Sequence, residues 1–201
     1  MSAEIFFIYD SHCPWSYAAS PLLAEIAKAR NDITIHTLHC AYYHGDNAVD
    51  AAKLKDIESL STVTFSDAYK QQCEQRQDST LIANLMSWVE QKAQGKALNL
   101  LANLQEQHFK HGNALSSEQD VKPTIDTLKL SPPAKSLRAS KLCKEAEYAI
   151  GDIDEIQQII GTQAIPALLL AVDDELILLN HNLYIGQPKK IVDAIAIELG
   201  E

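Results

Sequence analysis

The sequence predicts an α/β fold into which an all-helical subdomain is inserted. Residues 5–38 follow the pattern strand, helix, strand, and residues 46–158 show almost only helical periodicity. The chain then closes with two strands and a helix. Because a βαβ crossover joins parallel strands, the first two strands should share one sheet. We expect one domain from residues 1–45 and 159–201, and an inserted helical subdomain from residues 46–158.

The N-terminal elements have clear local signals. Residues 5–9 are apolar, partly β-branched and aromatic, which is typical of a buried strand. Apolar residues at helical spacing begin at Trp15 and continue to Ile26, which predicts a helix. Alternation over residues 33–38 predicts the second strand.

The middle of the chain predicts several amphipathic helices. Leu81, Leu85 and Val89 fall on one helical face, and Leu101 and Leu104 fall on another. Two further helices are expected, a short one at residues 124–128 and one over residues 134–149 with Gly151 near its end.

Strand character returns near the C-terminus. Residues 167–172 and 175–179 flank the turn signal Asp173-Asp174 and predict a β-hairpin. Residues 189–199 predict a final helix.

Composition excludes several classes of function. The formal net charge of −10 argues against binding to nucleic acid or to an anionic membrane surface. No run approaches the roughly 20 apolar residues of a membrane span, and the N-terminus lacks the pattern of a secretory signal. The histidines and cysteines show no paired metal-ligand spacing, so we expect no metal. We interpret the four cysteines as reduced thiols of a cytoplasmic protein, since none forms a CxxC pair.

The segment Cys13-Pro14-Trp15-Ser16 is the principal candidate for chemistry. Cys13 lies where the first strand ends and the first helix begins, and Pro14 suits the first helical turn. Free N–H groups and the positive end of the helix dipole favour a thiolate over a thiol, which would lower the pKa of Cys13. The alternative is a cysteine that serves as a small buried hydrophobic residue.

The motif and its surroundings resemble those of the DsbA-like thioredoxin-fold family. The segment from Cys13 to Ser16 stands in place of the CxxC of that family, and Pro21 follows Ser16 as a helix-kinking proline does in many thioredoxins. Residues 161–167 resemble the loop that ends in a cis-proline, here Pro166, and residues 109–113, followed by residues 124–130, resemble the insert helices of the family. The resemblance spans nearly the whole chain and includes cytosolic FrnE-like disulfide oxidoreductases.

The resemblance implies a thioredoxin-like fold and a thiol-disulfide oxidoreductase or isomerase with Cys13 as nucleophile. Ser16 cannot form a disulfide, so the chemistry is expected to use a single thiol and to involve glutathione as a co-substrate, with no cofactor bound. Ser16 can donate a hydrogen bond toward the Cys13 sulfur and favour its thiolate. The expected partner is a protein or glutathione that carries a thiol or disulfide.

Substrate contacts are expected from residues beside the thiol. Pro14 and Trp15 lie within the motif, and a cis bond at Pro166 would let the backbone of Ile165 pair with an extended peptide or glutathione. His12 is a further candidate, because its charge could lower the pKa of the thiol or its ring could relay a proton. The alternative for His12 is a solvated loop histidine.

Several alternatives stay open at this stage. Kappa-class glutathione transferases and 2-hydroxychromene-2-carboxylate isomerases form a related branch, which typically has serine at the position of Cys13 and Ser-Asp where this chain has Gln187-Pro188. A third hypothesis is that the protein is a redox-inactive binding module. Cys40 is the only plausible resolving thiol in the chain. The substrate, the redox partner and the oligomeric state, a homodimer included, are left open.

Overall fold

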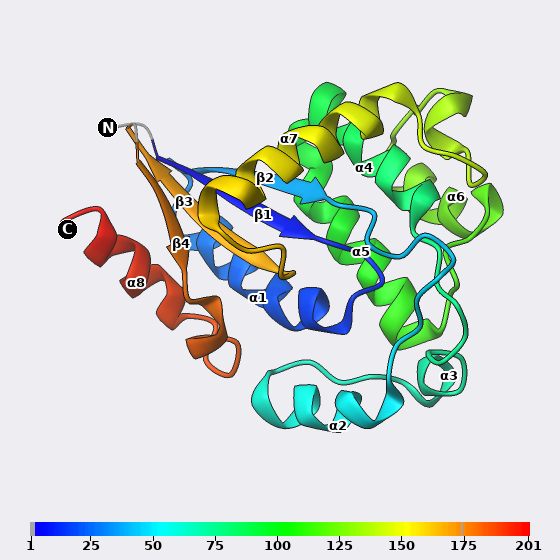
Figure 1. The fold of residues 1–201 in the computed structure, drawn as a ribbon, viewed down its shortest axis with the longest axis horizontal. Coiled ribbons are helices and arrows are strands. Elements are labelled where there is room, and N and C mark those ends of the chain that lie inside the picture. Colours follow the sequence, from blue (N-terminus) through cyan, green and yellow to red (C-terminus); the bar gives the residue numbers. More distant parts are fainter. Residues whose placement is uncertain (1–2, 174) are drawn as a thin grey trace.

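The computed structural model describes residues 3–173 and 175–201, and these form a four-stranded sheet flanked by helices on both faces (Figure 1). The strand order is β2-β1-β3-β4. β1 pairs with β2 in parallel, and β3 is antiparallel to both β1 and β4. The strands are β1 (Ala3–Tyr9), β2 (Thr34–His39), β3 (Ala167–Val172) and β4 (Glu175–Leu179). The predicted parallel pair and hairpin are confirmed, although Asp174 of the expected turn lies outside the described residues.

The helices divide into two groups by their place in the chain. α1 and α8 belong to the segments that carry the strands, and every other α-helix in the described part of the chain lies between β2 and β3. The α-helices are α1 (Pro14–Ala29), α2 (Ala51–Leu60), α3 (Asp67–Lys70), α4 (Thr80–Lys92), α5 (Ala97–His111), α6 (Glu118–Thr127), α7 (Lys144–Ile160) and α8 (Lys190–Glu198). Short 3₁₀ helices are η1 (Gln94–Lys96), η2 (Ala134–Leu137) and η3 (His181–Leu183). The α/β class is confirmed, and the division at residues 45/46 and 158/159 stays a prediction.

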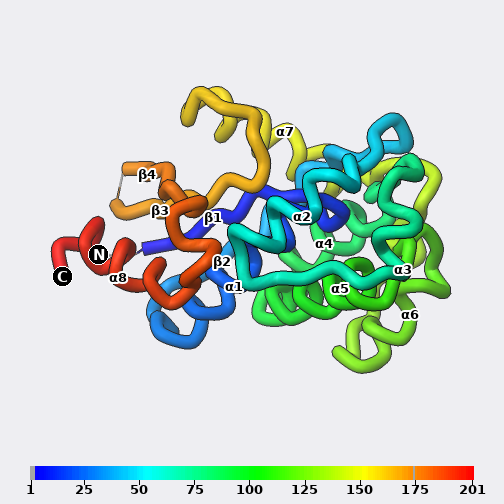
Figure 2. Tube along the Cα trace, turned by 90° about the horizontal axis from the view of Figure 1, so that it is seen from below, coloured from blue at the N-terminus to red at the C-terminus, as the bar shows by residue number. Residues whose placement is uncertain are grey.

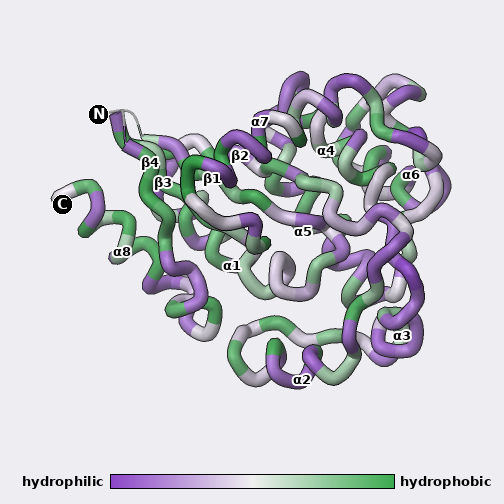
Figure 3. Tube along the Cα trace, in the orientation of Figure 1, coloured by the Kyte–Doolittle hydropathy of each residue, from purple (hydrophilic) through white to green (hydrophobic). Residues whose placement is uncertain are grey.

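Because side chains alternate along each strand, the two faces of the sheet pack against different helices. In β1, Ile5 and Phe7 are fully buried in the core cluster that includes α1 and α8, whereas Ile8 is buried in the cluster that includes α7. Figure 2 shows the sheet between α7 on one side and α1 and α8 on the other. Both faces are covered, which accounts for the largely apolar sequences of the central strands β1 and β3 (Figure 3).

The prediction of one helix over residues 134–149 is wrong. The structure has a 3₁₀ turn at 134–137 and begins α7 only at Lys144, and α7 continues past Gly151 to Ile160, with Gly161 (φ +70°) as its C-cap residue. The side chain of Asn84, fully buried in α4, holds the intervening segment. Its Nδ2 donates to the carbonyl oxygens of Arg138 at 2.7 Å and Lys141 at 3.0 Å, and its Oδ1 accepts from the amide of Cys143 at 2.7 Å. Cys143 therefore precedes the helix rather than lying inside it.

Replacing Asn84 with alanine should lower the free energy of unfolding by about 2–3 kcal/mol, because it leaves the buried amide of Cys143 and two partly buried carbonyl groups without their hydrogen-bond partner. Urea denaturation measures the change. Asn103→Ala is the matched control, since the Asn103 Nδ2 bonds only to the Asn99 carbonyl within α5. Equal losses of unfolding free energy in the two variants would show that the hydrogen bonds of the Asn84 side chain do not stabilise the fold.

Candidate functional site

Cys13 lies at the junction that the sequence predicts. It is the N-cap residue of α1, with extended backbone angles (φ −81°, ψ 118°), and Pro14 opens the helix. The amide of Cys13 donates to the Asp10 carbonyl at 3.1 Å, and the Cys13 carbonyl accepts from the amide of Tyr17 at 3.0 Å. These two bonds fix the turn between β1 and α1, so the position of the sulfur follows from the end of the strand and the start of the helix.

The thiol is buried more deeply than the sequence indicates. Cys13 is only 7% exposed. Burial raises the pKa of the Cys13 thiol, because removal from water disfavours the thiolate, and the nearby Asp10 carboxylate raises it further. A side-chain hydrogen bond with Ser16 and the backbone amides of Ser16 and Trp15 act in the opposite direction. The expectation of a lowered pKa is therefore wrong, because the effect of burial exceeds that of the helix N-terminus.

Two cavities meet at the loop that carries Pro166. The first, of about 460 Å³, contains Cys13 and has walls that include Pro14, Trp15 and Ile165. The second, of about 670 Å³, includes Pro166 and shares Trp15 and Ile165 with the first. The peptide bond between Ile165 and Pro166 is cis. Both cavities lie within the size range of small-molecule sites.

Ser16 lies behind the thiol rather than in the cavity wall. It is fully buried, and besides its bond with Cys13 its Oγ lies 3.4 Å from the amide of Asp10. A fully buried hydroxyl can act on substrate only through Cys13, by stabilising the thiolate.

The roles expected for His12 do not agree with its position in the structure. Both the solvated histidine and the substrate contact considered from the sequence need an accessible ring, but His12 is fully buried and does not line either cavity. Its Nε2 lies 3.1 Å from the carbonyl oxygen of Ala114, and its ring lies 4.3 Å from that of His108, centroid to centroid. Burial lowers the pKa of His12, so at neutral pH the ring carries no charge with which to stabilise a thiolate.

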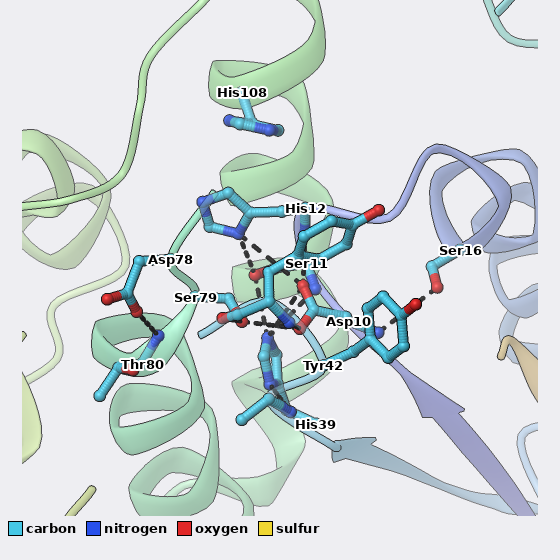
Figure 4. Close-up of polar contacts among 12 residues, drawn as sticks. Asp10, Ser11, His12, Ser16, His39, Tyr42, Asp78, Ser79, Thr80 and His108 are labelled. Carbon is cyan, nitrogen blue, oxygen red and sulfur yellow. Dashed lines mark hydrogen bonds and ion pairs between the residues drawn. The ribbon is translucent and has the colours of Figure 1, made fainter. Parts of the chain in front are cut away.

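A buried polar cluster beneath the motif was missed by the sequence reasoning (Figure 4). Its centre is Asp10, the first residue after β1, which is fully buried. The Asp10 Oδ1 accepts from the amide of His12 at 2.8 Å, and Oδ2 accepts from the amide of Tyr43 at 3.1 Å and from the Ser79 hydroxyl at 2.6 Å. Asp10 was visible in the sequence only as a turn residue, because its partners are distant in the chain.

A chain of hydrogen bonds extends from this cluster to the loop between α5 and α6. The amide of Ala41 is directed at Nδ1 of His39 at 3.1 Å and the amide of Ser11 at Nε2 at 3.1 Å, so each ring nitrogen of His39 faces a backbone N–H group. The Ser11 hydroxyl lies 2.9 Å from Nε2 of His39 and 2.9 Å from Nδ1 of His12. His12 then donates through Nε2 to Ala114. Burial lowers the pKa of His39 to about 4, which agrees with a neutral ring.

Two tyrosines after β2 and two further cysteines were also located in the structure. Tyr42 and Tyr43 line the Cys13 cavity. Cys40 is partly buried, and burial raises the pKa of its thiol well above the ordinary range. Cys73 lies in the turn after α3. Within residues 3–173 and 175–201, no group of three or more histidine, cysteine or acidic side chains is arranged to hold a metal ion. No helix in that same part of the chain is long and apolar enough to cross a bilayer.

The chain has a fold similar to that of DsbA-like thioredoxin-fold proteins, with Cys13 at the start of its first helix. No protein-family model and no curated protein matches the sequence. Among solved structures, the chain is similar to the cytosolic disulfide reductase DsbM from Pseudomonas aeruginosa with GSH, at 19% identity and a TM-score of 0.81 over 98% of this chain and 100% of that one. A candidate protein disulfide isomerase from Nitrosomonas europaea matches at 12% identity and a TM-score of 0.74 over the full length of both chains. A 2-hydroxychromene-2-carboxylate isomerase matches at 15% identity and a TM-score of 0.59 over 98% of this chain and 95% of that one. At these identities the likeness establishes the fold.

Proposed function

We propose that the protein is a thiol-disulfide oxidoreductase or isomerase that works through the single thiol of Cys13 and uses glutathione as co-substrate. The observation that carries this proposal is the place of Cys13 in a cavity that is also lined by Ile165, beside the cis bond at Pro166. Ser16 occupies the position where a second motif thiol would stand, so the motif has no resolving thiol of its own. The likeness in fold to DsbM, a structure described with GSH, supports the choice of glutathione.

The proposed exchange proceeds in two balanced steps. The Cys13 thiolate attacks the glutathione sulfur of a mixed disulfide R–S–S–G, forms a bond to that sulfur and releases R–S⁻, which takes up a proton. A glutathione thiolate then attacks the glutathione sulfur bound to Cys13, which yields oxidised glutathione and restores the Cys13 thiolate. The net reaction reduces R–S–S–G to R–SH and oxidises one glutathione. Ser16 stabilises the Cys13 thiolate through its hydrogen bond in both steps.

Ile165, Pro166, Pro14 and Trp15 are the proposed substrate contacts. Ile165 and Trp15 border both cavities, so an extended substrate bound along Ile165 would have the thiol on one side and the larger cavity on the other. Leu60 and Leu178 of the larger cavity are 56% and 46% exposed, which suits an apolar side chain of a protein substrate.

Incubation with glutathione disulfide, followed by mass spectrometry, tests the proposal. We expect one glutathione on Cys13, removed again by excess reduced glutathione, together with turnover of a glutathione mixed disulfide. Modification of Cys40, Cys73 or Cys143 without modification of Cys13 would contradict it.

Lys53 is expected to contribute to the binding of glutathione. It is the only basic side chain among the described residues that line the Cys13 cavity, and glutathione carries two carboxylates. Lys53→Gln should raise KM for a glutathione mixed disulfide about three- to tenfold, as loss of one ion pair in a cavity of intermediate exposure does. A small uncharged disulfide should be reduced with unchanged KM.

Lys55→Gln is the matched control for Lys53. Lys55 is an exposed lysine of the same helix but does not line the cavity. If the two variants change KM equally, or if Lys53→Gln affects the uncharged disulfide as much as the charged one, Lys53 does not bind glutathione.

A redox-inactive binding module is the second candidate, and the burial of Cys13 favours it, since burial raises the pKa of the thiol. The rate of alkylation of Cys13 against pH separates the two candidates. A thiol that reacts near neutral pH supports the enzyme, whereas a thiol that reacts only above its ordinary pKa of about 8.5 supports the binding module. We propose a cytoplasmic location in either case, consistent with the absence of a CxxC pair.

A further inference from the structure

Asp10 joins three separate parts of the chain at one buried carboxylate. Its own backbone belongs to the turn that presents Cys13, its Oδ2 accepts from the amide of Tyr43 in the loop after β2, and the same oxygen accepts from Ser79 at the start of α4 (Figure 4). No lysine or arginine pairs with this carboxylate in the described part of the chain, and Nδ1 of His12 and Nε2 of His39 lie 3.8 and 4.0 Å from its Oδ1. The carboxylate therefore depends on neutral donors for its stabilisation.

Ser79 uses its side chain for this contact and not for its own helix. It is the N-cap residue of α4, where a serine hydroxyl ordinarily accepts from the first helical turn, but it makes no such bond. Asp78 accepts from the amide of Thr80 instead, at 2.9 Å. The Ser79 Oγ lies 2.6 Å from Asp10 Oδ2 and 3.0 Å from the carbonyl oxygen of Tyr43, and the Ser79 amide donates to that same carbonyl at 2.8 Å.

The loop that Asp10 and Ser79 hold is a wall of the Cys13 cavity. Tyr43 is 6% exposed and Tyr42 is 51% exposed, and both border the cavity. Both backbone groups of Tyr43 are hydrogen-bonded. Its amide donates to Asp10, and its carbonyl accepts from the amide of Ser79. An O–H···O⁻ contact of 2.6 Å has the length of a charge-assisted hydrogen bond. The start of α4 and the Cys13 turn are thus connected through one wall of the site.

We propose that Ser79, acting through Asp10, is a positioning residue that sets the place of the Tyr42–Tyr43 wall relative to the Cys13 thiol. Its effect on catalysis rests on the proposed function, whereas its effect on the reactivity of the thiol does not. Without the Ser79 hydroxyl, the wall should loosen and admit water to the sulfur. The thiol would then ionise more readily, and the cavity would bind glutathione less well.

Ser79→Ala tests the proposal through the alkylation of Cys13 against pH. We expect the pH at the midpoint of the alkylation profile to be lower than in the unchanged protein. We also expect KM for a glutathione mixed disulfide to rise about three- to tenfold, with a smaller change in kcat. Ser79→Thr retains the hydroxyl and should restore both values. Ser87→Ala removes another buried serine of α4 that lines neither cavity, and it should leave both values unchanged.

Two measurements keep the proposal open to refutation. An unchanged alkylation profile in Ser79→Ala, an equal change in Ser87→Ala, or failure of Ser79→Thr to restore the profile would overturn it. If Ser79→Ala does not fold, hydrogen exchange on the unchanged protein gives the answer, because a Tyr43 amide bonded to Asp10 must exchange as slowly as the amides of β1, and fast exchange would overturn the proposal. Alkylation requires no turnover, so a protein without exchange activity would refute the proposed function and still report on Ser79.

Discussion

Replacing Cys13 with alanine is expected to reduce the turnover of a glutathione mixed disulfide by at least about a thousandfold, because the proposed mechanism has no other nucleophile in the cavity. The neighbouring hydroxyl of Ser16 cannot substitute, since it is fully buried and forms no disulfide. Turnover is measured with reduced glutathione and a mixed disulfide as substrates. The free energy of unfolding should fall by about 1 kcal/mol, since the change removes one buried sulfur atom at a helix end.

Cys40→Ala is the matched control for this experiment. The Cys40 thiol is partly buried and does not line the cavity of Cys13, and burial raises its pKa well above the ordinary range. We expect turnover within about twofold of the unchanged protein. A large loss of turnover in Cys40→Ala would instead assign Cys40 the resolving role that the sequence left open. Substantial turnover in Cys13→Ala would contradict the proposed mechanism altogether.

The parts of the site that follow from adjacent residues could be predicted from the sequence. An apolar run, turn residues and a helical stripe place Cys13 at the N-terminus of α1, and Pro14 opens that helix as expected. The hairpin of β3 and β4 has the same local origin. In each case the signal and the structure it determines lie within a few residues, so periodicity and turn chemistry are sufficient.

The parts that depend on distant partners could not be predicted. The hydroxyl of Ser79 and the carboxylate of Asp10 are 69 residues apart in the chain, and Asn84 reaches a carbonyl 54 residues away. The sequence likewise gives no sign that His12, between a serine and a cysteine in a polar turn, is covered by residues 102 positions further on. Tertiary contacts override local patterns at these positions, and they also bury Cys13.

Acidification from pH 7 to pH 5 is expected to lower the free energy of unfolding, because several histidines are buried in the neutral state. Burial lowers the pKa of His39 to about 4, and it also lowers the pKa of His12 and His108. A histidine in the unfolded chain has a pKa of about 6.5. Between these values the unfolded chain binds more protons than the folded protein does, so stability decreases as the pH falls through this window.

His39 alone should account for a loss of about 2 kcal/mol at pH 5 relative to pH 7, from the difference between a folded pKa of about 4 and an unfolded pKa of about 6.5. His12 and His108 act in the same direction. His36 opposes them, since its contact with Glu90 raises its pKa and stabilises the folded protein below about pH 6.5. That side chain is 25% exposed, so solvent screening reduces its contribution and the net effect is a loss.

Urea denaturation at the two pH values measures the loss, and variants identify its source. His39→Gln should reduce the difference between pH 7 and pH 5 by about the contribution of that one ring, although the variant is less stable at pH 7 because the His39 ring no longer connects Ala41 with Ser11. His44→Gln, at a side chain that is 58% exposed, should leave the difference unchanged. NMR titration of the rings gives a separate test that needs no variant. A His39 ring that titrates near pH 6.5 in the folded protein would show that it is solvated, and the buried hydrogen-bond chain from His39 through Ser11 to His12 would then be wrong.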